Sequence, residues 1–238
     1  MKALALLLIL PVSTFAAEHD HGAAAVQPDH TVMMEHGGTL QSFLLVNRFE
    51  HQHIDGDDTA IWDAQAWYGG DYNKLWLKSE GEWNSGLRSL ESHELQVLFS
   101  HAIAPFWDVQ AGLQHSTGPD ASRSHAVLGV QGFAPYWFDV DASALISERG
   151  DVQLRFATEY DLRLTQRLLL QPRLELNHAF NDDAPAGIEK GLIGSSVGLR
   201  LRYEFIREFA PYIGVEREVG NHRQPDATRL VAGFRVWY

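Results

Sequence analysis

The clearest pattern in the chain lies in residues 151–205, where apolar and polar side chains alternate at every second position. The alternation runs through 151–165, restarts at 167–181 and returns at 192–206. A period of two is typical of a β-strand with one apolar and one polar face. These stretches exceed the roughly five or six residues usual for strands in soluble sheets. Long strands of this kind favour a barrel in lipid, with apolar side chains outward and charged side chains in the lumen.

Strand-like segments of this kind continue along the rest of the chain. Their predicted ranges are 39–52, 59–69, 74–84, 92–104, 106–116, 125–134, 137–147, 151–165, 167–181, 192–206, 209–219 and 229–238. The links alternate between short and mostly longer ones, as in outer-membrane barrels, whose short turns face the periplasm. We therefore predict an all-β fold, a transmembrane antiparallel up-and-down β-barrel of about 12 strands over residues 39–238. The alternative, a soluble periplasmic β-sandwich, should show shorter strands and a polar outer face.

The residues before this region have a different character. Residues 1–17 have the features of a secretory signal peptide, with Lys2, an apolar run over 3–10 and small residues before a cleavage site. Residues 18–38 have too little apolar content to pack a core, and we predict a disordered tail containing histidine and methionine. An even number of strands puts both ends of the barrel on one side, so this tail is expected in the periplasm.

Composition narrows the classes of function. The chain has no cysteine, which excludes disulfides and thiolate metal sites. A formal net charge of −12 argues against nucleic acid as a partner. The triplet alanine-proline-aromatic occurs three times, starting at Ala104, Ala134 and Ala210, and we expect each at a short turn with its aromatic ring at the membrane interface.

Several combinations of tryptophan, glycine and proline in these segments are specific. They are Trp62-Asp63-Ala64, Gly69-Gly70-Asp71-Tyr72-Asn73, Ala104-Pro105-Phe106-Trp107-Asp108, Ala134-Pro135-Tyr136-Trp137-Phe138, Leu170-Gln171-Pro172-Arg173 and Glu208-Phe209-Ala210-Pro211-Tyr212. With these motifs the chain resembles the copper resistance protein B family of bacterial outer-membrane proteins, over about residues 36–238. The resemblance implies an outer-membrane barrel in periplasmic copper tolerance. It implies copper ions, Cu(I) and/or Cu(II), as ligand, and outer-membrane lipid and periplasmic copper carrier or oxidase proteins as partners.

The candidate metal ligands fall into two groups. In the tail they are His19, His21, His30, Met33, Met34 and His36. Imidazole suits Cu(II) and thioether suits Cu(I), although imidazole also binds zinc and nickel. Tails of the resembled family are often longer and richer in methionine. We therefore expect this tail to bind metal mainly through histidine imidazoles. The competing interpretation is a solvated leader with incidental histidines.

The second group is at the predicted external rim. His51 and His53 end the first strand and project to the same face, which makes them the preferred rim ligands. The other histidines expected toward this rim are His93, His115, His125, His178 and His222, whereas His101 is expected near the periplasmic end. Polar loops often contain histidine, and this is the competing explanation for the rim.

The predicted lumen has its own charge pattern. On the third to seventh strands the inward side chains include Glu80, Glu82, Glu94, Asp108, Asp139 and Asp141, with Lys78 as the only inward base expected there. Such a wall would attract cations. Most inward charges on the eighth to tenth strands alternate in sign, and the competing interpretation, favoured for those strands, is a lumen filled by charges that pair across neighbouring strands.

Three functions follow from these features. The leading hypothesis is a non-enzymatic copper-binding protein of the outer membrane that retains periplasmic copper or passes it outward. A general diffusion pore is the first alternative. The second alternative is an outer-membrane lipid hydrolase, for which His115-Ser116 is the only motif in the sequence. Adjacent residues on a strand point to opposite faces, which argues against this histidine acting as base for this serine.

A square-planar Cu(II) site is predicted at the mature N-terminus. Signal cleavage after Ala16 leaves Ala17-Glu18-His19, so that the amine, two backbone amides and one imidazole can surround an ion in the plane that Cu(II) prefers. Because these ligands must lose protons, copper binding should weaken as pH falls. Mass spectrometry of the mature N-terminus, and paramagnetic resonance spectra of wild type and His19→Ala, test the site. Cleavage after Ala17, or identical spectra, would rule it out.

Overall fold

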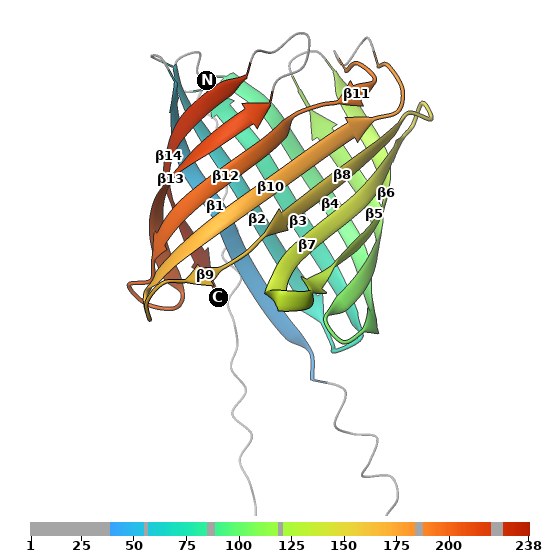
Figure 1. Cartoon of the computed structure of the whole chain (residues 1–238). Helices are drawn as coiled ribbons and strands as arrows, with labels where there is room; N and C mark the ends of the chain where they lie inside the picture. Colours follow the sequence, from blue (N-terminus) through green and yellow to red (C-terminus); the bar gives the residue numbers. More distant parts are fainter. Residues whose placement is uncertain (1–38, 55–56, 85–88, 119–120, 184–187, 220–225) are drawn as a thin grey trace, which may run out of the picture. The chain divides into compact units, whose positions relative to one another are not determined.

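The computed structural model describes residues 39–54, 57–84, 89–118, 121–183, 188–219 and 226–238. The predicted signal peptide 1–17 and the predicted tail 18–38 lie outside these ranges and stay predictions. The described residues consist almost entirely of β-strands (Figure 1). No helix among them is long and apolar enough to cross a membrane.

The strands follow one another in an antiparallel order around the molecule. Their bounds are β1 (Gln41–Ile54), β2 (Asp57–Gly69), β3 (Asn73–Asn84), β4 (Ser89–Ala104), β5 (Trp107–Thr117), β6 (Ser122–Ala134), β7 (Phe138–Ser147), β8 (Val152–Glu159), β9 (Leu162–Arg163), β10 (Leu168–Ala179), β11 (Gly191–Leu192), β12 (Ser195–Tyr203), β13 (Phe209–Val219) and β14 (Ala227–Trp237). A single 3₁₀ turn, η2 (Pro135–Trp137), joins β6 to β7.

The sheet closes on itself through two pairings. Strand β1 pairs with β14, and β8 pairs with β10. The two-residue strands β9 and β11 both pair with β10 and are the short continuations of β8 and β12. The described residues therefore form a closed antiparallel barrel of twelve strand positions, which confirms the predicted fold class.

The long strand predicted over 151–165 is interrupted for a visible reason. Its partner strand β10 contains Pro172, which lies beside the break between β8 and β9. The Tyr160 amide donates a hydrogen bond of 3.1 Å to the Pro172 carbonyl. Proline has no N–H, so Pro172 cannot donate the reciprocal hydrogen bond to Tyr160. The regular pairing between the two strands is therefore interrupted at this position.

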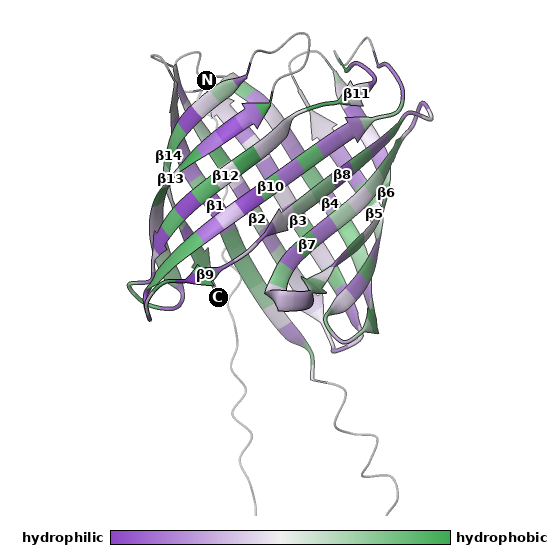
Figure 2. Ribbon diagram, in the orientation of Figure 1, coloured by the Kyte–Doolittle hydropathy of each residue, from purple (hydrophilic) through white to green (hydrophobic). Residues whose placement is uncertain are grey.

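The two faces of the barrel wall differ in chemistry. Leu113, Ile213 and Leu230 point outward and expose 68%, 64% and 67% of their surfaces. Arg200, Glu50 and other charged residues point inward and are almost fully buried. Hydropathy along single strands alternates accordingly (Figure 2). An apolar exterior around a polar interior is the arrangement expected of a barrel in lipid.

A β-bulge in β1 reverses the parity of that strand. The register with β2 and with β14 shifts around Asn47. Before the bulge Leu45 faces inward and is 5% exposed; after it Glu50 and Gln52 face inward and are 1% exposed each. An extra residue in one strand has this effect because side chains alternate with a period of two. His51 consequently points away from the lumen.

The lumen also contains an apolar region that the charge pattern did not predict. Trp76, Leu98, Val127 and Leu145 form a buried cluster, with Trp67 packed against it. Trp67 and Trp76 belong to a row of interior rings on β14, β1, β2 and β3, with centroids 6.1–6.3 Å apart, in the order Trp237, Phe43, Trp67 and Trp76. Part of the lumen is thus filled by close packing.

The alanine-proline-aromatic triplets are not equivalent. Phe106 and Tyr136 lie in tight turns with φ of 70° and 69°, consistent with the predicted turns. The third triplet lies inside β13 instead of at a turn, and its Tyr212 is 5% exposed and faces the lumen. The expectation of a third interfacial ring was therefore wrong, because this tyrosine has inward parity.

The face assignment predicts opposite effects for two neighbouring residues of β10. Leu174→Arg places a charge on the lipid face and should destabilise the barrel by about 2–4 kcal/mol if it lies at the bilayer midplane. Arg173→Leu instead removes a lumen group that pairs with Glu159 and Glu175 at 3.2 Å each. Insertion into lipid vesicles and heat modifiability measure the difference. Equal insertion of both variants would contradict the assignment.

Candidate functional site: the charged lumen and its histidines

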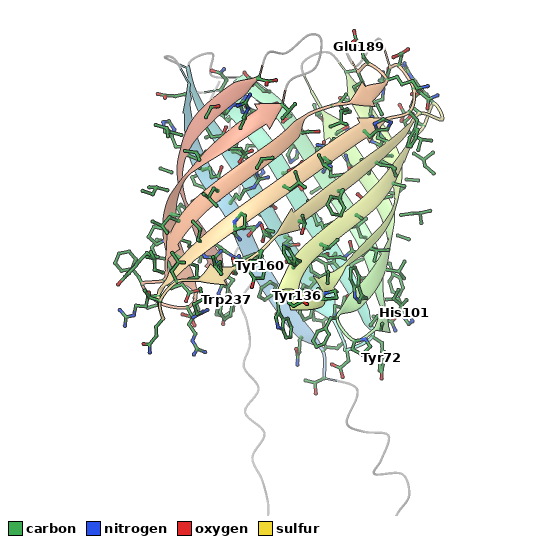
Figure 3. All side chains as sticks on the ribbon, in the orientation of Figure 1. Tyr72, His101, Tyr136, Tyr160, Glu189 and Trp237 are labelled. Carbon is green, nitrogen blue, oxygen red and sulfur yellow. The ribbon has the colours of Figure 1, made fainter. Side chains whose placement is uncertain are left out.

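The interior of the barrel is lined by ion pairs, many of which join strands that are not neighbours. Figure 3 shows Tyr72, His101, Tyr136, Tyr160 and Trp237 toward the end of the short turns and Glu189 at the opposite end. We call these the short-turn end and the long-loop end. Three groups of charged side chains lie along the lumen between these two ends.

The most buried group connects β12, β13 and β1. Arg200 donates from Nε to Glu50 at 2.6 Å and from Nη2 to Glu216 at 2.5 Å. The Tyr212 hydroxyl donates to Glu50 at 3.0 Å. Gly198 leaves room for the Arg200 guanidinium, since a Cβ there would lie 2.4 Å from its Nη1. Charges buried to this extent need such partners because they have lost their hydration.

A second group neutralises the predicted acidic wall. Lys78 reaches from β3 to Asp141 on β7 at 2.7 Å, and Lys74 pairs with Asp108 at 2.9 Å. Lys74 is therefore a second inward base, which the parity analysis omitted. Both ammonium groups also lie over interior indole rings, 5.7 Å and 5.6 Å from the centroids. The wall on β3 to β7 is therefore ion-paired over much of its length, through contacts between strands that are not neighbours.

A third group crosses the middle of the lumen. Asp63, Glu80 and Glu94 are directly opposite one another on β2, β3 and β4, and all face inward. Like charges in this arrangement repel. Arg155 extends from β8 across the barrel and pairs with Glu94 at 2.8 Å and with Glu80 at 3.7 Å. Arg48 pairs with Asp63 at 3.4 Å. Two arginines thus hold three adjacent carboxylates.

Arg155 also separates two cavities. One, of about 90 Å³, is lined by Gln110, Asp139, Asp141 and residues around them. The other, of about 120 Å³, is lined by Glu82, Ser92, Trp62 and Arg48 among others. Glu80 and Arg155 belong to the walls of both. The Arg155–Glu80–Glu94 contact, which we call the septum, therefore lies between two small cavities.

A further ion pair lies toward the long-loop end. Arg123 on β6 makes two hydrogen bonds to Asp183, at 2.7 Å and 2.9 Å. Both side chains are less than a tenth exposed, and Asp183 belongs to the connection that follows β10. A planar guanidinium matches both oxygens of a carboxylate, so this pair fixes the direction in which the connection leaves the barrel.

The predicted metal ligands are only partly within the described residues. His19, His21, His30, Met33, Met34 and His36 lie outside them. His51 is exposed and lies 3.3 Å from Asp58. The backbone of His53 pairs with Asp58 on β2, and its side chain lies outside the described part. The rim site at His51 and His53 stays a prediction.

The remaining histidines do not gather into one centre. Among the described residues, no group of three or more histidine, aspartate or glutamate side chains is arranged to hold a metal ion. His93 contacts Ser79 at 3.4 Å, and His178 packs on Phe180 with ring centroids 4.9 Å apart. His125 differs from them, because it faces the lumen and is 5% exposed. His101 lies at the short-turn end, as predicted (Figure 3). His222 lies outside the described residues.

The histidine and serine that suggested a lipid hydrolase in the sequence are not paired in the structure. His115 Nδ1 lies 3.1 Å from the hydroxyl of Ser124 on the neighbouring strand, and Ser116 bonds to the Arg123 carbonyl on the other face. His115 therefore does not contact Ser116. Parity explains the result, since adjacent residues on a strand face opposite ways.

A closed antiparallel barrel with an apolar exterior and an ion-paired lumen defines a β-barrel protein of the outer-membrane type. A solved NanC porin structure has a similar fold, with a TM-score of 0.54 at 14% identity, over 81% of this chain and 98% of that one. Residues 40–238 match the family model described as copper resistance protein B precursor (CopB). The chain belongs to the copper resistance protein B family.

Two curated relatives agree with this assignment. Copper resistance protein B of Escherichia coli is 38% identical over 213 residues, which cover 85% of this chain and 71% of the relative. A copper resistance protein B homolog of Pseudomonas syringae pv. tomato is 38% identical over 229 residues, covering 92% and 77%. The resemblance drawn from the sequence motifs is confirmed.

Removing the septum arginine should open the lumen to cations. In Arg155→Gln the two cavities should join, and Glu80 and Glu94 lose their shared counter-charge, so the path is lined by free carboxylates. We expect a larger single-channel conductance than wild type in planar bilayers, with a reversal potential that indicates cation selectivity. Arg217→Gln, which breaks an exposed pair with Asp226, is the matched control. A wild type that already conducts as well as Arg155→Gln would contradict the septum.

Proposed function

We propose that this protein binds copper at the outer membrane, collecting periplasmic copper ions on residues 18–38 and retaining them or passing them outward. Membership of the copper resistance protein B family supports copper as the ligand. The tail supplies imidazole and thioether groups, which suit Cu(II) and Cu(I) respectively. The barrel holds the tail at the membrane, and the protein carries out no reaction on the ion.

The ion-paired lumen is the observation that favours a copper-binding protein over a general diffusion pore. Arg155 reaches across the barrel to Glu94 at 2.8 Å, and Lys78 reaches from β3 to Asp141 at 2.7 Å. A general pore needs a continuous water-filled channel. A lumen crossed by paired charges instead favours a protein that binds its ion, and any outward passage requires the septum to move.

The positions of the chain ends support an orientation in the membrane. The first and last strands meet at the short-turn end, where the backbones of Leu44 and Tyr238 exchange two hydrogen bonds of 2.8–2.9 Å. Short turns face the periplasm in bacterial barrels. The segment before β1 is therefore assigned to the periplasm, where copper carrier or oxidase proteins are candidate partners. His51 and His53, near the other end of β1, are assigned to the external rim as a second copper site.

Deleting residues 18–36 should separate the two parts of this proposal. The barrel pairing begins at Gln41, so the truncated protein should still insert and migrate as a heat-modifiable band. Most copper should be lost, because six of the eight proposed ligands are removed. Elemental analysis of both forms, after equal loading with Cu(II) or with Cu(I) under reducing conditions, measures the stoichiometry.

The copper left on the truncated form tests the rim site. It should fall further when His51→Ala and His53→Ala are added, whereas His101→Ala at the opposite end should have no effect. Full copper stoichiometry after the deletion would contradict a copper-binding tail, and failure of the truncated chain to insert would contradict the division into tail and barrel.

A further inference from the structure

A cluster of arginines surrounds a cavity at the short-turn end of the lumen. The cavity has a volume of about 140 Å³ and lies against β12, β13 and β14. It is lined by Asp161, Arg202, Glu204, Arg207, Ala210, Arg235 and Trp237. Its three guanidinium groups outnumber its two carboxylates. The cavity is separate from the septum, shares no residue with it, and takes no part in the copper proposal.

Arg202 contributes a buried donor that the protein leaves unused. Its side chain is 4% exposed, and its Nη2 donates to Asp161 at 2.5 Å. Its Nη1 is also buried and has no hydrogen-bond partner. A buried guanidinium N–H without an acceptor is costly, because the group has lost its hydration and gained no hydrogen bond in return. Arg202 therefore lines the cavity while one of its donors has no acceptor in the protein.

Arg235 is a second unused cation. It faces the lumen from β14, opposite Ala210 on β13. No ion pair joins it to a carboxylate among the described residues, in contrast to Arg200, Arg202 and Arg229. Asp139 and Glu159 act on it only through longer-range attraction. Its charge is therefore only partly compensated by the protein.

The shape of the cavity depends on the small side chain between these arginines. Ala210 is 4% exposed and fills little of the space between β12 and β14. Arg207 lies in the adjoining turn, where its carbonyl accepts a hydrogen bond of 2.8 Å from Trp237 Nε1. The two carboxylates of the cavity are already engaged, Asp161 with Arg202 and Glu204 with Arg163 at 3.8 Å. The net charge of the residues that line the cavity is therefore positive.

We propose that this cavity is an oxyanion site at the periplasmic mouth of the barrel. Its ligand is a small dissolved anion with a phosphate or carboxylate group, held by Arg202 and Arg235 with Arg207 at the entrance. Guanidinium groups bind such oxygens through paired, charge-assisted hydrogen bonds. The lining faces the lumen, so the ligand enters from the periplasmic solution and not from the lipid around the wall.

Calorimetric titration of the purified, copper-free full chain in detergent tests the site. Inorganic phosphate and succinate are titrated separately, which distinguishes the phosphate class from the carboxylate class. We expect saturable binding of at least one of them, weakened at least tenfold in Arg235→Gln. Arg235 has no ion pair to lose, so this variant should keep the heat-modifiable barrel. Arg217→Gln, at an exposed pair near the long-loop end, should bind as wild type does.

A second variant keeps the proposal testable if Arg235→Gln does not fold. Ala210→Leu preserves every charge and fills the cavity, so it should also abolish binding. The inference is overturned if wild type binds neither anion, or if the folded Arg235→Gln or Ala210→Leu protein binds as tightly as wild type. Copper binding by the tail should be unchanged in both variants, so this result and the copper proposal can fail separately.

Discussion

Closure of the sheet is the constraint on which the rest of this molecule depends. In hydrocarbon, an unpaired strand edge leaves N–H and C=O groups with no water to satisfy them. The pairing of β1 with β14 removes the last edge, and the hydrogen bonds between Leu44 and Tyr238 extend this pairing by one residue. Once the ring is closed, every second side chain must enter a confined interior. The charged lumen is a consequence of that geometry.

Charges in this interior have to be balanced by other side chains. The protein does so locally on β12, β13 and β1, where Arg200 lies between Glu50 and Glu216. It does so at long range where Arg155 meets Glu94. The balance is incomplete at the short-turn end, where Arg235 has no partner among the described residues. A variant that removes one member of a buried pair therefore leaves the charge of its partner uncompensated inside the barrel.

Much of the fold could be predicted from the sequence because a period of two is local. The strand ranges, the closed twelve-position barrel and the inward parity of Arg173 and Arg200 all follow from alternation along single segments. The likeness to the copper resistance family was also readable, since its tryptophan, glycine and proline positions are close together in the chain. Local patterns of this kind can be recognised without knowing which strands pair with each other.

Other features depend on distances that alternation does not encode. The bulge at Asn47 inserts one residue, and no glycine or proline in the sequence marks its position. It turns the His51 side chain from the lumen face to the outer face of β1. The partners Arg155 and Glu94 are 61 residues apart, and Glu50 and Arg200 are 150 apart, so their meeting follows from closure. Parity alone could have found Lys74 and the interior Trp67 and Trp76. The copper ligands of the tail remain predictions.

The burial of the Arg200–Glu50 pair has a consequence for how the barrel responds to its surroundings. Dissolved ions screen exposed charges over about 10 Å at 0.1 M salt, but they screen buried pairs much less. The exposed Arg217–Asp226 pair will weaken as salt rises, whereas the Arg200 and Glu50 side chains are almost fully buried and are shielded by the wall itself. The cohesion of the barrel should therefore vary little between dilute and saline surroundings, while attraction of ions to its rims varies strongly.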